Sequence, residues 1–81
     1  MRNLRLEVLV EPVKEHEPGP HVHAALAALE QEGLEPDMGP FATTVEGGAE
    51  QIASALSHML LSAIESGATA LQIRVEVSDE R

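Results

Sequence analysis

The stretch AEQIASALSHMLLSAIESGATALQIRVEV, residues 49–77, contains the two clearest structural patterns of this 81-residue chain. From residue 49 to residue 64, apolar side chains recur every three or four positions, which predicts a helix with one broad apolar face. Gly67 is placed to end that helix. From Leu71 to Val77 apolar and polar residues alternate, which predicts a strand with one buried face.

The first half of the chain repeats this order of patterns. Residues 4–11 alternate as a strand does, and Pro12 ends the alternation because proline cannot donate to a strand ladder. A helix is predicted from about Pro20 to Glu32, with Gly33 as its C-terminal cap. The next segment predicts a short, irregular edge strand at 34–38 and a better strand at 41–46.

The element order is therefore β-α-β-β-α-β. Two helices with one apolar face each are expected to cover one face of a four-stranded sheet. We predict an α+β fold, a ferredoxin-like βαββαβ sandwich with a four-stranded antiparallel sheet, in a single domain over residues 1–81. Crossover connections are expected to make the first and third strands adjacent and parallel at the centre. The residues expected to face the helices are Leu4, Leu6, Val8, Val10, Leu71, Ile73, Val75 and Val77.

Composition excludes several classes of function. The chain carries 14 acidic and 5 basic residues, a net charge of −9, which repels nucleic acid and anionic membranes. It has no cysteine, so it offers neither a thiolate nucleophile nor a Cys-based zinc site. The N-terminal residues lack the apolar run of a signal peptide, and no stretch is long enough to span a membrane. We therefore expect a cytoplasmic protein without nucleic-acid or membrane partners.

Three histidines lie close together before and at the start of the first predicted helix. His16, His21 and His23 include an H-x-H pair, which is a weak metal-site spacing. On a helix, residues two apart point in different directions, so the competing interpretation is a polar helix start on the surface. The sequence predicts no resident metal or other cofactor, and a metal-responsive role for this segment remains an alternative.

Two glutamates on neighbouring predicted strands are the best candidates for a polar site. Glu7 and Glu46 fall on central strands, and Glu46 lies at the start of the second helix. A catalytic pair would need an enclosed carboxyl group, and no nucleophile or cofactor motif accompanies these two. We therefore expect a protein that is not an enzyme. The side of the sheet away from the helices carries both charge signs and Leu9, and we expect it to form a subunit interface.

The run from Met38 to Gly47, which ends in Thr44-Val45-Glu46-Gly47, resembles the MTH1187/YkoF-like thiamine-binding family, the DUF77-type small ferredoxin-like proteins. The helix end from Ala63 to Ala68 and the apolar strand from Ala70 to Val77 are similar as well. The resemblance extends over almost the whole chain.

This resemblance implies a non-catalytic protein that binds thiamine or its hydroxymethylpyrimidine moiety for uptake, salvage or sensing. It also implies a homodimer or homotetramer that associates through the sheet. A cationic thiazolium would pair with Glu7 or Glu46, and an aminopyrimidine would bond Thr43 or Thr44. The alternative is an oligomeric protein-interaction or regulatory module.

Overall fold

The computed structural model describes residues 2–13, 17–40 and 42–78. It confirms the predicted order of strands and helices. The elements are β1 (Asn3–Glu11), α1 (Pro20–Gln31), β2 (Asp37–Met38), β3 (Thr43–Gly48), α2 (Ala49–Glu65) and β4 (Ala70–Val77). No helix within the described part of the chain has the length and apolar character needed to cross a membrane.

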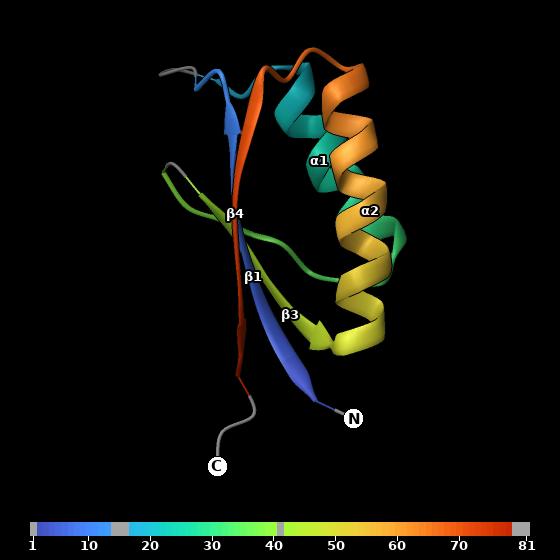
Figure 1. The fold of residues 1–81 in the computed structure, drawn as a ribbon. Coiled ribbons are helices and arrows are strands. Elements are labelled where there is room, and N and C mark those ends of the chain that lie inside the picture. The colour runs from blue at the N-terminus through green and yellow to red at the C-terminus, as the bar shows by residue number, and fades with distance from the viewer. Residues whose placement is uncertain (1, 14–16, 41, 79–81) are drawn as a thin grey trace.

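The four strands form one sheet in the order β2-β3-β1-β4, with both helices on the same face (Figure 1). All neighbouring strands are antiparallel, as the predicted fold class requires. The prediction that the first and third strands are parallel is wrong, because Leu4 pairs with Gly47 and Val8 with Thr43 in antiparallel register. The reason is that β3 follows β2 through a tight reversal, so it runs opposite to β2 and also to β1.

The second strand is shorter than predicted. Of residues 34–38, only Asp37 and Met38 pair with β3. Pro36 has no N–H to donate to a ladder, and the N–H of Gly39 donates to the carbonyl of Ala42 at 2.8 Å, which closes the turn into β3. The predicted strand at 41–46 is shifted to Thr43–Gly48, and Phe41 lies outside the described residues.

Each helix ends within one or two residues of its predicted end, and the two ends have the same backbone arrangement. At the end of α1, Gly33 has a φ of +85°, and the N–H of Leu34 donates to the carbonyl of Leu29 at 3.2 Å. At the end of α2, the N–H of Ala68 donates to the carbonyl of Ala63 at 2.9 Å. In both cases a residue with positive φ lets the chain turn back and satisfy a helix carbonyl that would otherwise lack a partner.

The core lies between the sheet and the two helices. Aliphatic side chains of β1 and β3 form its floor, and the small side chains of the helices allow α1 and α2 to pack closely against each other. The fully buried side chains of largest volume include Leu6, Leu29, Ile52 and Met59. The complete buried apolar set is Leu6, Val8, Val10, Ala25, Ala28, Leu29, Leu34, Val45, Ile52, Ala55, Met59, Ala63 and Ala68.

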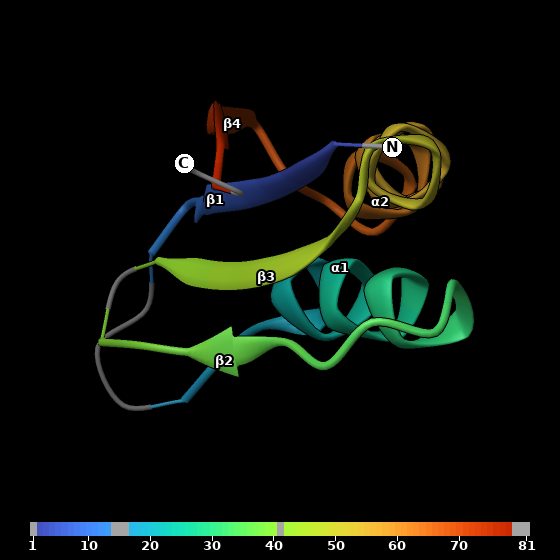
Figure 2. The ribbon, with the colours of Figure 1, turned by 90° about the horizontal axis from the view of Figure 1, so that it is seen from below.

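The edge strand β4 departs from the predicted burial. Its register with β1 places Ile73 beside Val8 and Val75 beside Leu6, so the predicted helix-facing side is confirmed. Ile73, Val75 and Val77 are nevertheless exposed. The helices pack on β1 and β3, and Figure 2 shows α1 on the β2–β3 side of the sheet and α2 on the β1 side, with β4 at the far edge. Of the four apolar residues on this side of β4, only Leu71 packs against the core.

Candidate functional site

The sheet face opposite the helices, here called the open face, brings together most of the polar side chains predicted to bind a ligand. The register of the strands sets its pattern. Arg5 of β1 lies between Glu46 of β3 and Glu76 of β4. In the next row, Glu7 lies between Thr44 and Arg74. Side chains opposite each other on such strands have Cβ atoms about 5 Å apart, so each row forms a continuous polar surface.

The open face carries more negative than positive charge. Asp37 pairs with Thr44 and extends the second row onto β2. Arg5 is shared, because its Nη1 lies 3.7 Å from Oε1 of Glu76 and 4.0 Å from Oε1 of Glu7. The Nε of Arg74 lies 3.2 Å from Oε1 of Glu76. Four carboxylates thus face two guanidinium groups (Asp37, Glu7, Glu46 and Glu76 against Arg5 and Arg74), and such an excess attracts cations.

A hollow of about 460 Å³ adjoins this face at the outer edge of β3. Because β2 pairs only with Thr43 and Thr44, the second half of β3 has no β2 residue beside it. The hollow is lined there by Thr44 and Glu46, with Arg5 and Asp37. Its volume is within the usual range of small-molecule sites, which is about 300–1,000 Å³.

The wall of this hollow depends on a close approach between β3 and the helix layer. The side chain of Gln51 lines the hollow, and its Nε2 donates to the carbonyl of Glu32 at 2.9 Å. A Cβ at Gly47 would lie 2.7 Å from Oε1 of Gln51 and 2.8 Å from Cδ2 of Leu34. Glycine at position 47 therefore lets the strand pass against these two side chains. The sequence showed this residue only as part of a strand-to-helix turn.

A second hollow, of about 330 Å³, lies on the open face itself. Glu7 and Leu9 of β1 line it together with Gln72 and Arg74 of β4 and Ala42. Because Glu7 and Thr44 are register partners, the two hollows lie next to each other.

The four predicted ligand residues therefore divide into two groups. Glu7, Thr44 and Glu46 share the open face and line the two hollows. Thr43 lies on the opposite, helix-facing side with Val8 as its partner, and it is only 8% exposed. Adjacent residues of a strand point to opposite faces, so the two threonines could not share a site on one side of the sheet.

Sequence reasoning did not single out Asp37 or Gln51 as site residues. Asp37 precedes a turn whose geometry sets the register of β2, so its face could not be assigned from local pattern. Gln51 comes from α2, and only the packing of that helix on β3 places it beside Glu46.

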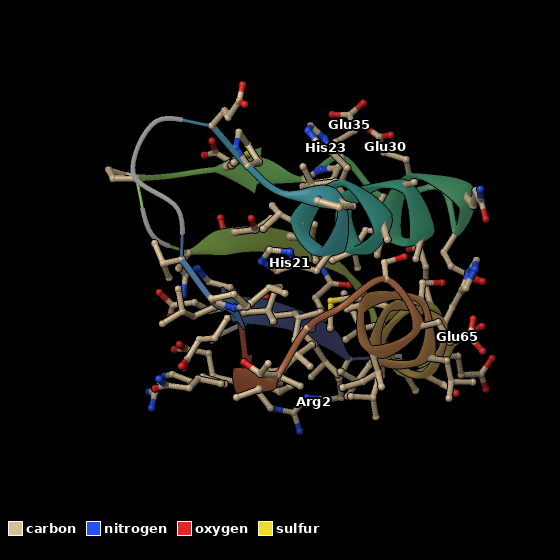
Figure 3. The ribbon with its side chains drawn as sticks, turned by 90° about the horizontal axis from the view of Figure 1, so that it is seen from above. Arg2, His21, His23, Glu30, Glu35 and Glu65 are labelled. Atoms are coloured by element: carbon tan, nitrogen blue, oxygen red, sulfur yellow. The ribbon has the colours of Figure 1, made fainter. Side chains whose placement is uncertain are left out.

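The histidine segment is arranged differently from the prediction. His21 is 3% exposed, and its Nε2 donates to the carbonyl of Pro12 at 2.6 Å. The prediction of a surface helix start is therefore wrong for His21, whereas His23 is exposed. Figure 3 shows His21 directed between α1 and the sheet, and His23 directed outward. His16 lies outside the described residues, among which no three metal-ligating side chains come together.

Comparison with known proteins agrees with this architecture. A family model described as thiamine-binding protein matches residues 6–81. The structure is similar to that of a DUF77 domain from Bacillus cereus (TM-score 0.69, 16% identity, covering 98% of this chain and 77% of that one). It is also similar to a hypothetical protein from Methanocaldococcus jannascii (TM-score 0.72, 17% identity, 100% and 84% covered).

A third similar structure comes from Thermotoga maritima and is described as a candidate thiamine biosynthesis or salvage protein (TM-score 0.66, 22% identity, 96% and 84% covered). At these identities the likeness shows the fold. No curated protein sequence gives a significant match.

Proposed function

The chain belongs to the thiamine-binding protein family, and from this premise we propose that it binds thiamine, or the hydroxymethylpyrimidine part of thiamine, on the open face without transforming it. The observation that carries the proposal is the acidic surplus of this face beside a hollow of about 460 Å³. Thiamine carries a fixed positive charge on its thiazolium ring, and fixed carboxylates are the groups that attract it.

Each half of the ligand has suitable partners in adjoining places. The thiazolium lies against Glu46 or Glu7 on neighbouring strands. The aminopyrimidine, which needs both donors and acceptors, lies in the hollow at the edge of β3, beside the hydroxyl of Thr44 and the carboxylate of Asp37. We leave Thr43 out of the proposed contacts because its side chain is buried on the other side of the sheet.

Binding rather than catalysis is supported by how open this face is. The side chain of Glu7 is 40% exposed, and Glu46 is exposed as well. Acid–base catalysis by carboxyl groups usually relies on an enclosed environment that favours the protonated form of one of them. A role in uptake, salvage or sensing of the vitamin requires only reversible binding.

Titration calorimetry with thiamine and with hydroxymethylpyrimidine tests the proposal. We expect Glu46→Gln to weaken thiamine binding by about threefold to tenfold, the effect of one exposed charge a few ångströms from a cation. Glu50→Gln is the matched control, because Glu50 is also an exposed glutamate, lies in the first turn of α2 and lines neither hollow. Thiamine affinity should also fall as salt is added, because exposed charges are screened.

The two ligands separate the roles of the residues. Hydroxymethylpyrimidine lacks the charged thiazolium, so Glu46→Gln should weaken its binding less than it weakens thiamine binding. Thr44→Val removes a hydroxyl from the hollow and should weaken the binding of both compounds. Absence of heat with either compound at millimolar concentration, with the protein folded, would contradict the proposal. So would an equal loss of affinity in the Glu46 and Glu50 variants.

A further inference from the structure

The outer edge of β3 loses its strand partner part-way along its length. Within the described residues, β2 pairs with Thr43 and Thr44 only, and Figure 2 shows β3 continuing past β2 to reach α2. An extension of the same register would place Glu35 opposite Glu46. The chain lies in the helix layer at this point instead, because Leu34 is buried in the core. The hollow of about 460 Å³ therefore lies where a longer β2 would run.

The main chain of Glu46 points toward this hollow. The N–H of Gly39 donates to the carbonyl of Ala42 at 2.8 Å, so the carbonyl of Ala42 points toward the β2 side. At the other end of β3, the N–H of Ala49 donates to the carbonyl of Arg2 at 2.9 Å, so that N–H points toward the β1 side. Backbone groups alternate in direction along an antiparallel strand. Counted from either end, the N–H and C=O of Glu46 point outward, on the side of the hollow that this residue lines.

An outward N–H and C=O on one residue place a hydrogen-bond donor beside an acceptor. In an antiparallel ladder the opposite residue satisfies both groups at once, and peptides that bind at a sheet edge use the same pair. A small planar ligand that has an acceptor next to a donor makes the same two hydrogen bonds. The two groups are held in position before any ligand arrives, because residues 45 and 47 on either side are paired with β1.

The side chain of Gln51 adds a further acceptor to the hollow. Its Nε2 donates to the carbonyl of Glu32 at 2.9 Å, and a carbonyl can only accept, so the orientation of the amide is fixed. Oε1 is consequently the atom turned toward β3, where it would lie 2.7 Å from a Cβ at Gly47. Gly47 directly follows the carbonyl of Glu46, so the three groups stand along the edge in the order N–H, C=O, Oε1.

Acceptors outnumber donors among the described groups that face the hollow. The carboxylates of Glu35 and Asp37 line it as well. The donors include the hydroxyl of Thr44 and the guanidinium of Arg5, which is shared by two carboxylates of the open face. An amino group on a ligand supplies two N–H donors, whereas an oxo group supplies none. Such a surrounding therefore favours a ligand edge with an amino group.

We propose that the outward main chain of Glu46 and the Oε1 atom of Gln51 select a ligand that carries an amino group beside a ring nitrogen. This inference rests on the proposed binding of thiamine, whose aminopyrimidine has such an edge. The ring nitrogen accepts from the N–H of Glu46. One amino hydrogen is donated to the carbonyl of Glu46, and the other is donated to Oε1 of Gln51. The site thereby distinguishes the amino form of the ring from its oxo form.

Oxythiamine tests this selectivity with the wild-type protein. It keeps the charged thiazolium, but an oxo group replaces the amino group and the neighbouring ring nitrogen carries a proton. We expect titration calorimetry to give an affinity for oxythiamine about tenfold to a hundredfold below that for thiamine, because acceptors of the site then face an acceptor of the ligand. Equal affinities would overturn the inference and leave the proposed thiamine binding intact. Absence of binding by thiamine itself would overturn the proposed function and the inference together.

The variant Gln51→Leu tests the part played by the side chain. It removes the Oε1 acceptor, so the ratio of the affinities for thiamine and oxythiamine should fall severalfold. Gln31→Leu is the matched control, because Gln31 is a glutamine at the end of α1 that lines a different hollow. An unchanged ratio for Gln51→Leu, or an equal fall for Gln31→Leu, would contradict the role of Gln51.

The variant Glu46→Pro tests the part played by the main chain. Proline lacks the N–H, and it is tolerated in a strand where that N–H points away from the ladder. Glu46→Gln is the matched control, because both variants lack the carboxylate and only Glu46→Pro lacks the N–H. Hydroxymethylpyrimidine should bind Glu46→Pro more weakly than Glu46→Gln, and equal affinities would contradict the proposal. Circular dichroism checks that each variant is folded, and the comparison of thiamine with oxythiamine decides the inference without any variant.

Discussion

Strands β1 and β4 have the same alternation of apolar and polar residues, yet their apolar side chains differ in how far they are exposed. On the helix-facing side of β1, Leu6, Val8 and Val10 are 0%, 2% and 7% exposed. On the same side of β4, Ile73, Val75 and Val77 are 38%, 43% and 50% exposed. The strands pair along their whole length, so the difference does not arise from register. It arises from position, because β1 is central beneath the helices and β4 is an edge.

The comparison shows that alternation specifies which face of a strand is apolar and not what covers that face. A central strand of a four-stranded sheet is buried by two helices. An edge strand with the same sequence pattern keeps its apolar side chains exposed.

The largest expected effect comes from truncating matched residues of the two strands. Leu6→Ala should lower the free energy of unfolding by about 2–5 kcal/mol, because it leaves a cavity in a fully buried site. Val75→Ala should cost the monomer less than about 1 kcal/mol, because most of the removed surface is already in contact with water. Urea denaturation at low protein concentration measures both. Equal losses for the two variants would show that β4 is covered within the monomer.

A smaller effect is expected where the chain leaves β1. His21→Ala removes the partner of the Pro12 carbonyl in a buried setting, and we expect a loss of about 1–3 kcal/mol. His23→Ala, two residues away on the exposed side of α1, should change stability by no more than about 0.5 kcal/mol. The difference between the two denaturation midpoints measures how much the hydrogen bond between His21 and Pro12 contributes to stability. Indistinguishable midpoints would mean that the hydrogen bond contributes little.

The smallest effect is expected on the open face, where truncating a side chain of β1 or of β4 should cost a similar, small amount of stability. Gln72 of β4 donates from its Nε2 to Oε2 of Glu11 at 2.7 Å, and this contact is exposed. Gln72→Ala should therefore change the free energy of unfolding by no more than about 0.5 kcal/mol. A loss above about 1 kcal/mol in urea denaturation would indicate that the open face is packed against something.

Much of the fold followed from local patterns. Helix α2 and strand β4 were predicted nearly to the residue. Apolar side chains recur with the helical period through the seventeen residues of α2 and alternate with polar ones along the eight residues of β4, and a glycine separates the two elements. The prediction was weakest at residues 34–46, where Pro36, Gly39 and Pro40 interrupt both periods. There the length of β2 depends on a turn bond between Gly39 and Ala42, which no local pattern specifies.

The candidate site was only partly predictable. Side chains alternate between the two faces along a strand. This rule was enough to place Glu7 on the open face, and it separates Thr43 from Thr44. The register between β1 and β3 was needed to bring Arg5 opposite Glu46 and Glu7 opposite Thr44. Asp37 and Gln51 join them through tertiary packing alone, since one depends on a turn and the other on the docking of a helix.

The order of the elements, the apolar face of each and the acidic character of the whole chain follow from local sequence, because they depend on residue types and on periods of 2 and 3.6 residues. The antiparallel course of β1 and β3, the burial of His21 and the exposure of the apolar row of β4 follow from how the elements pack together. Those outcomes depend on which elements become neighbours. That choice is made by the free energy of packing two helices on four strands, and it is not encoded in the pattern of any one segment.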